Sequence, residues 1–82
     1  MKGNYLHKES VGKNITKKRK EAGFTQTTMA EAVAKEIEWE YGMRQYQKIE
    51  KGFFPKFKQE IVKAIDKILK TNFTPEIYEQ NF

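Results

Sequence analysis

The chain of 82 residues contains no cysteine and only one histidine, His7. Without cysteine, neither a disulfide nor a thiolate-bound metal can hold the fold, and a reducing cytoplasm is the expected compartment. One histidine and scattered carboxylates would make a poor metal site, and no HExxH motif, histidine pair or aspartate-rich loop is present. A phosphate-cradling loop is missing too. We therefore expect no metal, no cofactor and no catalysis.

Long apolar runs are also missing. The longest span only two or three residues, whereas a membrane-spanning helix needs about 20. Residues 1–10 lack the apolar stretch of a signal peptide. We therefore expect a soluble protein that stays inside the cell, away from the membrane. Its length leaves room for one domain, because chains below about 100 residues barely bury enough surface for one core.

Charge is abundant and unevenly distributed. Sixteen Lys and Arg residues against eleven Asp and Glu residues give a net charge of +5, which on a small body attracts phosphate backbones. Residues 1–30 carry a net charge of +5, residues 31–47 of −2, residues 48–70 of +4 and residues 71–82 of −2. A polyanion should therefore meet the first and third blocks and avoid the second.

Helical spacing of apolar residues predicts a first helix that begins near residue 10. Ser10 suits its N-terminal cap and Gly23 its C-terminal cap. One residue on the apolar face is charged: Arg19 needs a carboxylate partner, because an unpaired buried charge is costly. The repeating positions are Val11, Ile15, Arg19 and Ala22.

A second helix is predicted after Thr25, a good N-cap residue, at the Ala- and Glu-rich residues 26–34. Helix-favouring residues continue beyond it, and nothing stops a helix before the pair Tyr41-Gly42, so its end is left open. The apolar stripe of this helix consists of Met29, Ala30, Val33 and Ile37.

A third, short helix is predicted over residues 43–51, with Gly52 as its end. Its inward positions are Met43, Tyr46, Ile49 and Glu50, and its outward positions are Arg44, Lys48, Gln45 and Lys51. Glu50, on the inward edge, is the carboxylate that Arg19 needs. We therefore predict an ion pair between Arg19 and Glu50 that ties the first helix to the third.

A wide apolar stripe predicts a fourth and longest helix, which follows a turn at Phe53-Phe54-Pro55 and ends near Lys70. Thr74 and Pro75 favour the start of a short last helix over residues 75–81. The stripe consists of Phe57, Ile61, Val62, Ala64, Ile65, Ile68 and Leu69, and the apolar residues of the last segment are Phe73, Ile77, Tyr78 and Phe82. That last segment either covers the end of the fourth helix or makes a dimer contact.

These elements predict an all-α fold, a compact bundle of four to five helices. The bundle should occupy residues 11–70, between a basic N-terminal arm at residues 1–10 and an extension at residues 71–82. Termini fray unless they are tied down, so the arm with Tyr5 and His7 is expected to be flexible, with a contact to DNA as an alternative. The alternation typical of strands is absent apart from a few residues, so no sheet is expected.

From about residue 11 to residue 69 the chain resembles the phage-repressor family of helix-turn-helix regulators, the Cro and Xre type. In that family the segment reads Arg, Gly, Thr-Gln, Leu-Ala, an aliphatic residue and Ile-Glu-x-Gly. Here Met29 stands for the leucine and Tyr46 for the aliphatic residue. The other matching positions are Arg19, Gly23, Thr25, Gln26, Ala30, Ile49, Glu50 and Gly52. The resemblance implies a lambda-repressor-like DNA-binding domain.

The resemblance also implies roles for individual residues. At the start of the second helix, Gln26, by its side chain or backbone N–H, and Thr27 would meet a DNA phosphate, because the helix dipole favours anions there. The residues that would read bases in the major groove are Arg44, Gln45 and Lys48. The lysines that would follow the DNA backbone are Lys51, Lys56 and Lys58. The Arg19–Glu50 pair would be the family's structural salt bridge and would not touch DNA.

The chain departs from the family in one respect: extra residues lie between the second and third helices, within residues 35–42, here called the insert. Either the second helix is longer by over a turn, or the tight turn has become a loop. The insert is acidic and holds the only tryptophan, so it should be held away from phosphates. Its residues Ile37, Trp39 and Tyr41 are expected to pack in the core or within the insert, with a protein-binding site as the alternative.

The sequence thus favours a repressor-like transcription regulator that binds double-stranded operator DNA, in a phage or plasmid setting. A homodimer would suit it, because two-fold pairing reads two half-sites about 34 Å apart, but the sequence leaves this open. The alternative is a protein-interaction module on the same scaffold, an antirepressor, co-activator or conjugation accessory factor that acts through the insert. Non-specific DNA packaging is a third hypothesis.

Overall fold

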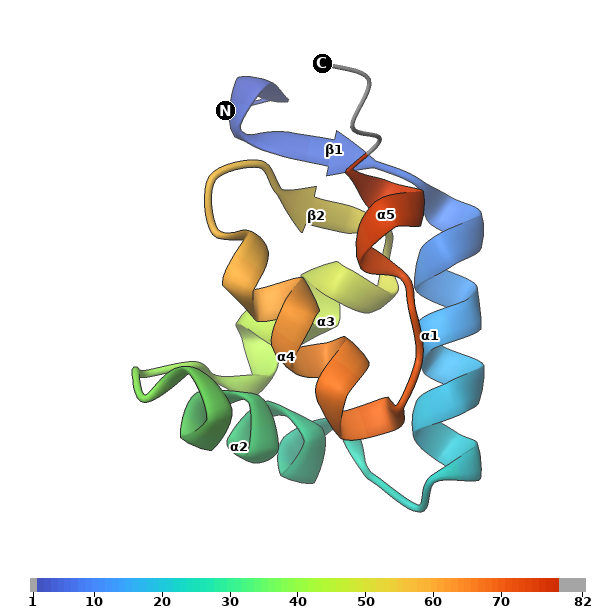
Figure 1. Cartoon of the computed structure of the whole chain (residues 1–82), viewed down its shortest axis with the longest axis vertical. Helices are drawn as coiled ribbons and strands as arrows, with labels where there is room; N and C mark the ends of the chain where they lie inside the picture. Colours follow the sequence, from blue (N-terminus) through green and yellow to red (C-terminus); the bar gives the residue numbers. More distant parts are fainter. Residues whose placement is uncertain (1, 79–82) are drawn as a thin grey trace.

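The computed structural model describes residues 2–78 and shows a mainly helical, compact domain with a Cα radius of gyration of 11.6 Å. Within this range there are five α-helices, one short 3-10 helix and two strands (Figure 1). In chain order they are η1 (Lys2–Asn4), β1 (Tyr5–His7), α1 (Glu9–Glu21), α2 (Gln26–Ile37), α3 (Met43–Glu50), β2 (Phe53–Pro55), α4 (Gln59–Leu69) and α5 (Thr74–Ile77). None of the helices in residues 2–78 is long and apolar enough to span a membrane. The prediction of a compact helical domain is confirmed at this level.

Helix α1 begins at Glu9 and no side chain caps it, so the prediction that Ser10 is its N-cap is wrong. Its C-terminal end is as predicted. Gly23 has a φ of 86°, in the left-handed region that glycine adopts without strain. The N–H of Phe24 then donates to the carbonyl oxygen of Arg19 at 3.1 Å, which satisfies a group that the end of a helix leaves open.

Helix α2 is capped as predicted. The Thr25 hydroxyl accepts from the Thr28 N–H at 3.0 Å, and the Thr28 hydroxyl accepts from the Thr25 N–H at 2.9 Å. The helix ends at Ile37, because Glu38 has a φ of 58°, and residues 38–42 form a loop. Helix α2 therefore takes up the first part of the insert, and the remainder forms a loop.

Helices α3 and α4 occur close to where the sequence predicts them, with two corrections. The prediction that the fourth helix is the longest is wrong, because α4 has 11 residues, whereas α1 has 13 and α2 has 12. Helix α3 ends at Glu50, and Gly52 beyond it has a φ of 95°. Helix α4 begins only at Gln59. Phe57, predicted as the first member of its apolar stripe, therefore lies before the helix, and 80% of its surface is exposed.

The two strands contradict the prediction of a flexible arm and of a turn at residues 53–55. Strand β1 pairs with β2 in an antiparallel sheet in which Leu6 lies opposite Phe54. The rings of His7 and Phe53 stack at a centroid distance of 4.3 Å. The backbone N–H of Lys8 extends the pairing by donating to the Gly52 carbonyl oxygen at 2.8 Å. The sheet thus attaches the N-terminal segment to the chain that follows α3.

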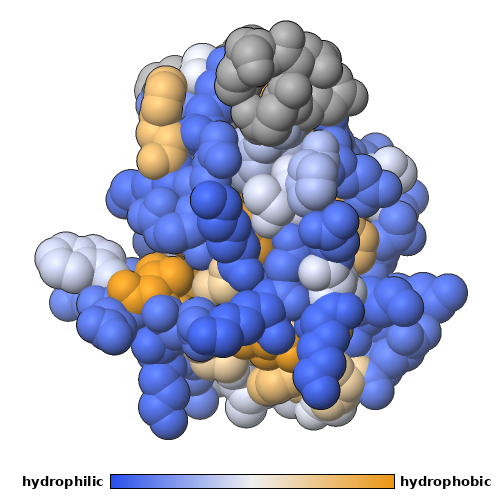
Figure 2. Space-filling model, in the orientation of Figure 1, coloured by the Kyte–Doolittle hydropathy of each residue, from blue (hydrophilic) through white to orange (hydrophobic). Residues whose placement is uncertain are grey.

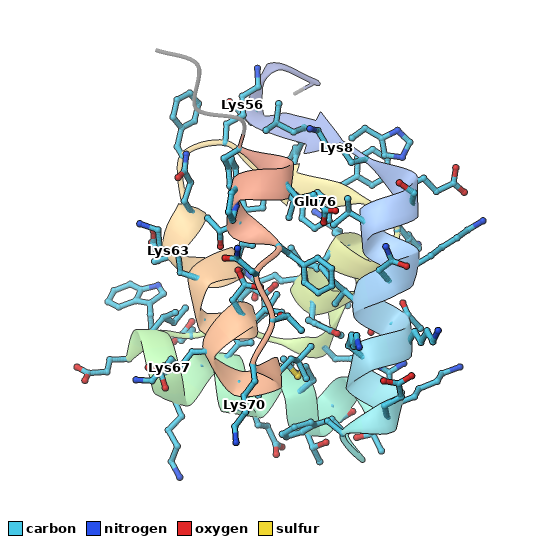
Figure 3. All side chains as sticks on the ribbon, turned by 45° about the vertical axis from the view of Figure 1, so that its right-hand side comes forward. Lys8, Lys56, Lys63, Lys67, Lys70 and Glu76 are labelled. Carbon is cyan, nitrogen blue, oxygen red and sulfur yellow. The ribbon has the colours of Figure 1, made fainter. Side chains whose placement is uncertain are left out.

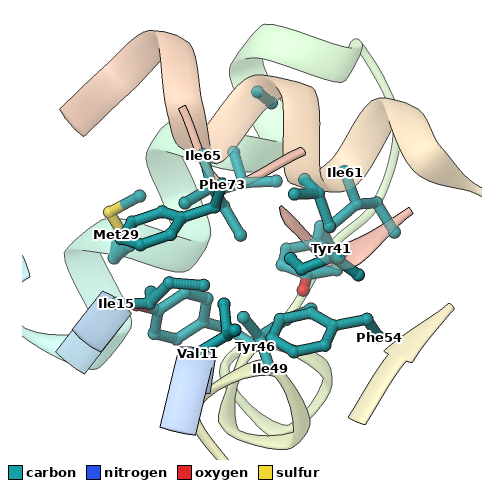
Figure 4. Packing of buried hydrophobic residues seen from close by; sticks show 14 of the residues in the cluster. Val11, Ile15, Met29, Tyr41, Tyr46, Ile49, Phe54, Ile61, Ile65 and Phe73 are labelled. Carbon is teal, nitrogen blue, oxygen red and sulfur yellow. The ribbon is translucent and has the colours of Figure 1, made fainter. Parts of the chain in front are cut away.

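The core lies between α1, α2, α3, α4 and the sheet (Figure 4). Tyr46 of α3, Phe54 of β2 and Ile15 of α1 have no exposed surface. The Tyr46 hydroxyl donates to Glu50 Oε2 at 2.7 Å, so the polar end of this buried ring is satisfied. Within the described part of the chain, no buried side-chain nitrogen or oxygen lacks a partner.

The apolar residues Phe73, Ile77 and Tyr78 are buried against their own chain, where α5 contacts α4. The Tyr78 hydroxyl donates to the carbonyl oxygen of Pro55. These residues were expected to cover the end of the fourth helix or to make a dimer contact; they pack on the core of their own chain, against α4 and beside β2, and are not exposed for a dimer contact. Phe82 and positions 79–81 of the predicted last helix lie outside the described residues.

Helix α5 is held at both ends of its single turn. It begins at Thr74, and the carboxylate of Asp66 in α4 accepts from the N–H groups of Phe73 and Thr74 at 2.7 and 2.8 Å. The Lys8 ammonium donates to the carbonyl oxygen of Glu76 at 3.1 Å (Figure 3). The C-terminal segment therefore connects α4 to the start of α1.

Candidate nucleic-acid interface

Helix α3 is fixed to α1 by direct backbone contact. A Cβ atom at Gly12 would lie 2.6 Å from the carbonyl oxygen of Glu50 and 2.7 Å from the nitrogen of Gly52. A Cβ atom at Gly52 would lie 2.8 Å from the Cα of Glu9. Only glycines at both positions allow the two segments to approach this closely. The start of α1 and the end of α3 therefore form a rigid junction.

The side chain of Glu50 is the centre of a buried polar network beside this junction. Arg19 Nε donates to Glu50 Oε2, and the two side chains are each only 8% exposed. Gln26 Nε2 donates to Glu50 Oε1 at 2.9 Å, and the Tyr46 hydroxyl donates to Oε2. The predicted Arg19–Glu50 pair is therefore present, and it joins α1, α2 and α3.

The surroundings of Glu50 favour its charged form. Burial would raise the pKa of this carboxyl, but hydrogen bonds from Arg19, Tyr46 and Gln26 outweigh burial and hold the pKa below its usual range. The hydrogen bond to Glu50 in turn raises the pKa of Arg19. Both groups thus stay charged at neutral pH, and their burial leaves them little surface for contact with a ligand.

Gln26 is the first residue of α2, but its side chain is used within the protein. Besides its bond to Glu50, its Oε1 accepts from Gln47 Nε2 at 3.1 Å. In this arrangement the amide is held by two other side chains, and the phosphate contact predicted for the Gln26 side chain or backbone N–H stays a prediction. Of the backbone N–H groups in the first turn, that of Thr28 is taken by the Thr25 hydroxyl. Those of Gln26 and Thr27 remain available for an anion, because the first N–H groups of a helix lack intrahelical partners.

The predicted base-reading residues all lie on the exposed side of α3, but they differ in their surroundings. Arg44 is exposed and has no side-chain partner among residues 2–78. Gln45 Oε1 accepts from the Gly42 N–H at 2.8 Å and so caps α3. The Lys48 ammonium lies 5.7 Å from the centre of the Tyr5 ring. Within the described residues, Arg44 is therefore the base-reading candidate whose side chain has no hydrogen bond, ion pair or ring contact.

The predicted phosphate-contacting residues are not all on one surface. Thr27 lies next to α3, where its hydroxyl donates to Met43 Sδ at 3.2 Å. Lys51 is exposed at the end of α3. Lys56 is half-buried and lies at the end of the molecule that carries the sheet, whereas α2 lies at the opposite end (Figure 3). Lys51 is thus the lysine of this group that directly continues the outer face of α3.

The insert differs from its prediction in the placement of its aromatic residues. Tyr41 is buried in the core, as expected. Ile37 is half-buried and packs against the core. Trp39, in contrast, has 74% of its surface exposed, so the expectation that it is packed is wrong. Because Glu38 turns the chain with a positive φ, Trp39 stands on the outside of the loop.

A cleft of about 550 Å³ separates the insert from the sheet and the outer side of α3. Buried Tyr41, Ile49 and Ile61 are among its lining residues. Its polar and aromatic lining includes Tyr5, Trp39, Glu40, Gln45, Lys48 and Lys58. Glu40 of the acidic insert shares this cleft with Gln45 and Lys48, and the expectation that the insert is held away from phosphates stays a prediction. The face of the molecule shown in Figure 2 is mostly hydrophilic, and most of its apolar side chains lie in the lower half, where Figure 1 shows α2 and α4.

Two residues of this region were not identified from the sequence. Gln47 connects α3 to α2 through its hydrogen bond to Gln26. A helical wheel places Gln47 between the inward and outward positions of its helix. This intermediate position is the only sequence signal that could have indicated its role. Tyr5 contacts Lys48 from a strand that the sequence does not predict. Its contact depends on the pairing of distant segments and has no local signal.

Neither the family models, nor the curated proteins, nor the solved structures with which this chain was compared match it. Within residues 2–78 no group of three or more His, Asp or Glu side chains could hold a metal ion. The function of the chain must therefore be inferred from the residues and their geometry.

Proposed function

We propose that this protein is a sequence-specific regulator of transcription that binds double-stranded DNA with α3, as a lambda-repressor-like helix-turn-helix domain. The observation that carries the proposal is the two-sided construction of α3. Its inner side is fixed to α1 and α2 through Glu50, and its outer side presents Arg44, Lys48 and Lys51. A rigid helix with cations on its free side is suited to the major groove.

The chemistry of the free side of α3 suggests how DNA would be read. The guanidinium of Arg44 can donate two hydrogen bonds to the O6 and N7 atoms of guanine. Lys51, one turn from Lys48 at the end of the helix, would contact a phosphate and position the protein without reading sequence. The first turn of α2 beside Thr27 would add backbone N–H groups to a second phosphate.

The Arg44→Ala variant tests this proposal. Selection from a random duplex library should enrich one operator sequence, which the wild type binds at least about 10³-fold more tightly than random DNA. Arg44→Ala should lose about 1–3 kcal/mol on that sequence and lose its preference at one base pair. Lys51→Ala, the matched control, should weaken binding to operator and random DNA alike and reduce the salt dependence.

Equal losses on operator and random DNA for Arg44→Ala would show that Arg44 does not read a base. A library that yields no enriched sequence would refute sequence-specific regulation, and binding with a steep salt dependence would then indicate DNA packaging. A palindromic operator would indicate that the protein binds as a dimer.

A second candidate function, a protein-interaction module, is favoured by the exposure of Trp39. We expect Trp39→Ala to change the free energy of unfolding by less than about 0.5 kcal/mol, because the indole makes few contacts to lose. If this function is correct, the variant keeps its DNA affinity and loses a binding partner in a pull-down experiment. Phe57→Ala is the matched control, because Phe57 is equally exposed but does not line the cleft. A partner that is retained by Trp39→Ala would count against this function.

A further inference from the structure

Strand β1 brings an aromatic ring to the side of α3 that carries the predicted base-reading residues. Tyr5 is half-buried, and the Lys48 ammonium lies 5.7 Å from its ring centre. This distance is within the range in which a cation is attracted to the face of an aromatic ring. A lysine side chain has many rotamers, so this attraction favours the one that turns Lys48 toward the sheet.

The ring itself is held by the fold rather than by Lys48. Tyr5 lies opposite Pro55 in the sheet. Backbone hydrogen bonds flank the paired strands at both ends: the Lys56 N–H donates to the Asn4 carbonyl oxygen at 3.0 Å, and the Lys8 N–H donates to the Gly52 carbonyl oxygen at 2.8 Å. Strand β2 follows α3 after only the Gly52 turn. The position of the ring relative to α3 is thus fixed by the same segment that ends the helix.

We propose that Tyr5 is a specificity-determining residue that positions the Lys48 ammonium for base reading. The proposal rests on the proposed DNA-binding function of α3. Tyr5 itself contacts no base in this mechanism. It restricts Lys48 to the side of the major groove that faces the sheet. The Lys48 ammonium would then donate to the base pair on that side and not to the adjacent base pair. Arg44, whose side chain has no partner, is unaffected.

The experiment compares the DNA preference of variants that keep the aromatic ring at position 5 with that of a variant that lacks it. Tyr5→Leu lacks the aromatic face, Tyr5→Phe keeps it, and His7→Ala disturbs the neighbouring stack in the same strand without touching Lys48. Each variant is put through the duplex selection, with Lys48→Met identifying the base pair that Lys48 reads. Tyr5→Leu should weaken the preference at that base pair about two- to five-fold, the effect of one exposed cation–π contact. The preference at the base pair read by Arg44 should not change, and Tyr5→Phe and His7→Ala should behave as the wild type.

A measurement without DNA separates the contact from the function. In the NMR spectrum of the free protein, the ring should shift the Lys48 ε-methylene resonances upfield in the wild type and in Tyr5→Phe, but not in Tyr5→Leu. Loss of this shift in Tyr5→Leu with an unchanged preference at the Lys48 base pair would overturn the positioning role while leaving the proposed function intact. A wild type with no base preference would overturn both, and the shift would then mark a purely structural contact.

Discussion

Glu50→Ala is expected to lower the free energy of unfolding by about 3–5 kcal/mol, the cost of leaving a buried charge without its partner. The guanidinium of Arg19 would keep only one hydrogen bond, to the carbonyl oxygen of Phe24 at 2.8 Å. Gln26 and Tyr46 would lose their acceptor at the same time. Since a domain of this size is stable by only about 5–10 kcal/mol, the variant should be close to unfolding at room temperature.

Urea denaturation followed by circular dichroism measures this loss. The matched control is Glu21→Ala, which removes an exposed ion pair with Lys18 and should cost less than about 1 kcal/mol. Replacing Arg19 and Glu50 together by methionine should recover part of the stability, because no unpaired charge then remains, whereas Gln26 and Tyr46 still lack their acceptor. A loss below about 1 kcal/mol in Glu50→Ala would mean that water reaches the network and that Glu50 does not hold the helices together.

Gly12→Ala is expected to destabilise the domain by about 3 kcal/mol, at the upper end of the cost of overfilling a packed site. In an unhindered helix this substitution would stabilise by up to about 1 kcal/mol, so here the sign of the effect is the test. The added methyl group would meet the backbone atoms of Glu50 and Gly52, which cannot rotate away as a side chain does. The start of α1 would have to move off the end of α3.

Thermal denaturation should show a midpoint lower by roughly 12–24 °C for Gly12→Ala, since 1 kcal/mol corresponds to about 4–8 °C in a domain of this size. Gly3→Ala is the matched control, because no atom lies within 4 Å of a Cβ at that position, and its midpoint should stay close to that of the wild type. An unchanged or higher midpoint for Gly12→Ala would show that α1 and α3 are not in rigid contact. A loss of DNA affinity by a still folded variant would indicate that this junction sets the orientation of α3.

The features predicted correctly from the sequence have local causes. Thr25 caps α2, and Gly23 and Gly52 follow helix ends in the left-handed conformation, because each of these roles depends on the residue itself and its immediate neighbours. The Arg19–Glu50 pair is long-range, but it was predictable because a charge on an apolar face needs a partner and one carboxylate lay on an inward edge.

The features that the sequence did not reveal depend on distant parts of the chain. Strands of three residues are too short for alternation to show, and their pairing joins Leu6 to Phe54. Gln26 was expected to meet a phosphate by its side chain or backbone N–H, and no local signal indicated that its amide is held by Gln47 and Glu50 of another helix. Trp39 was expected to be packed because large apolar residues usually are, and a single left-handed residue before it places it outside.

The pairing of β1 with β2 also determines when the domain can become native during its synthesis. The residues of β1 are made before α1, α2 and α3, whereas their partner strand is made after these three helices. Isolated helices as short as α1 are marginal in water, so the nascent chain has little to hold it until Phe53–Pro55 emerges. Until then its apolar residues stay accessible to chaperones and to other chains. The sheet can therefore form only after α3 has been made, in a step that joins the segment before α1 to the segment after α3.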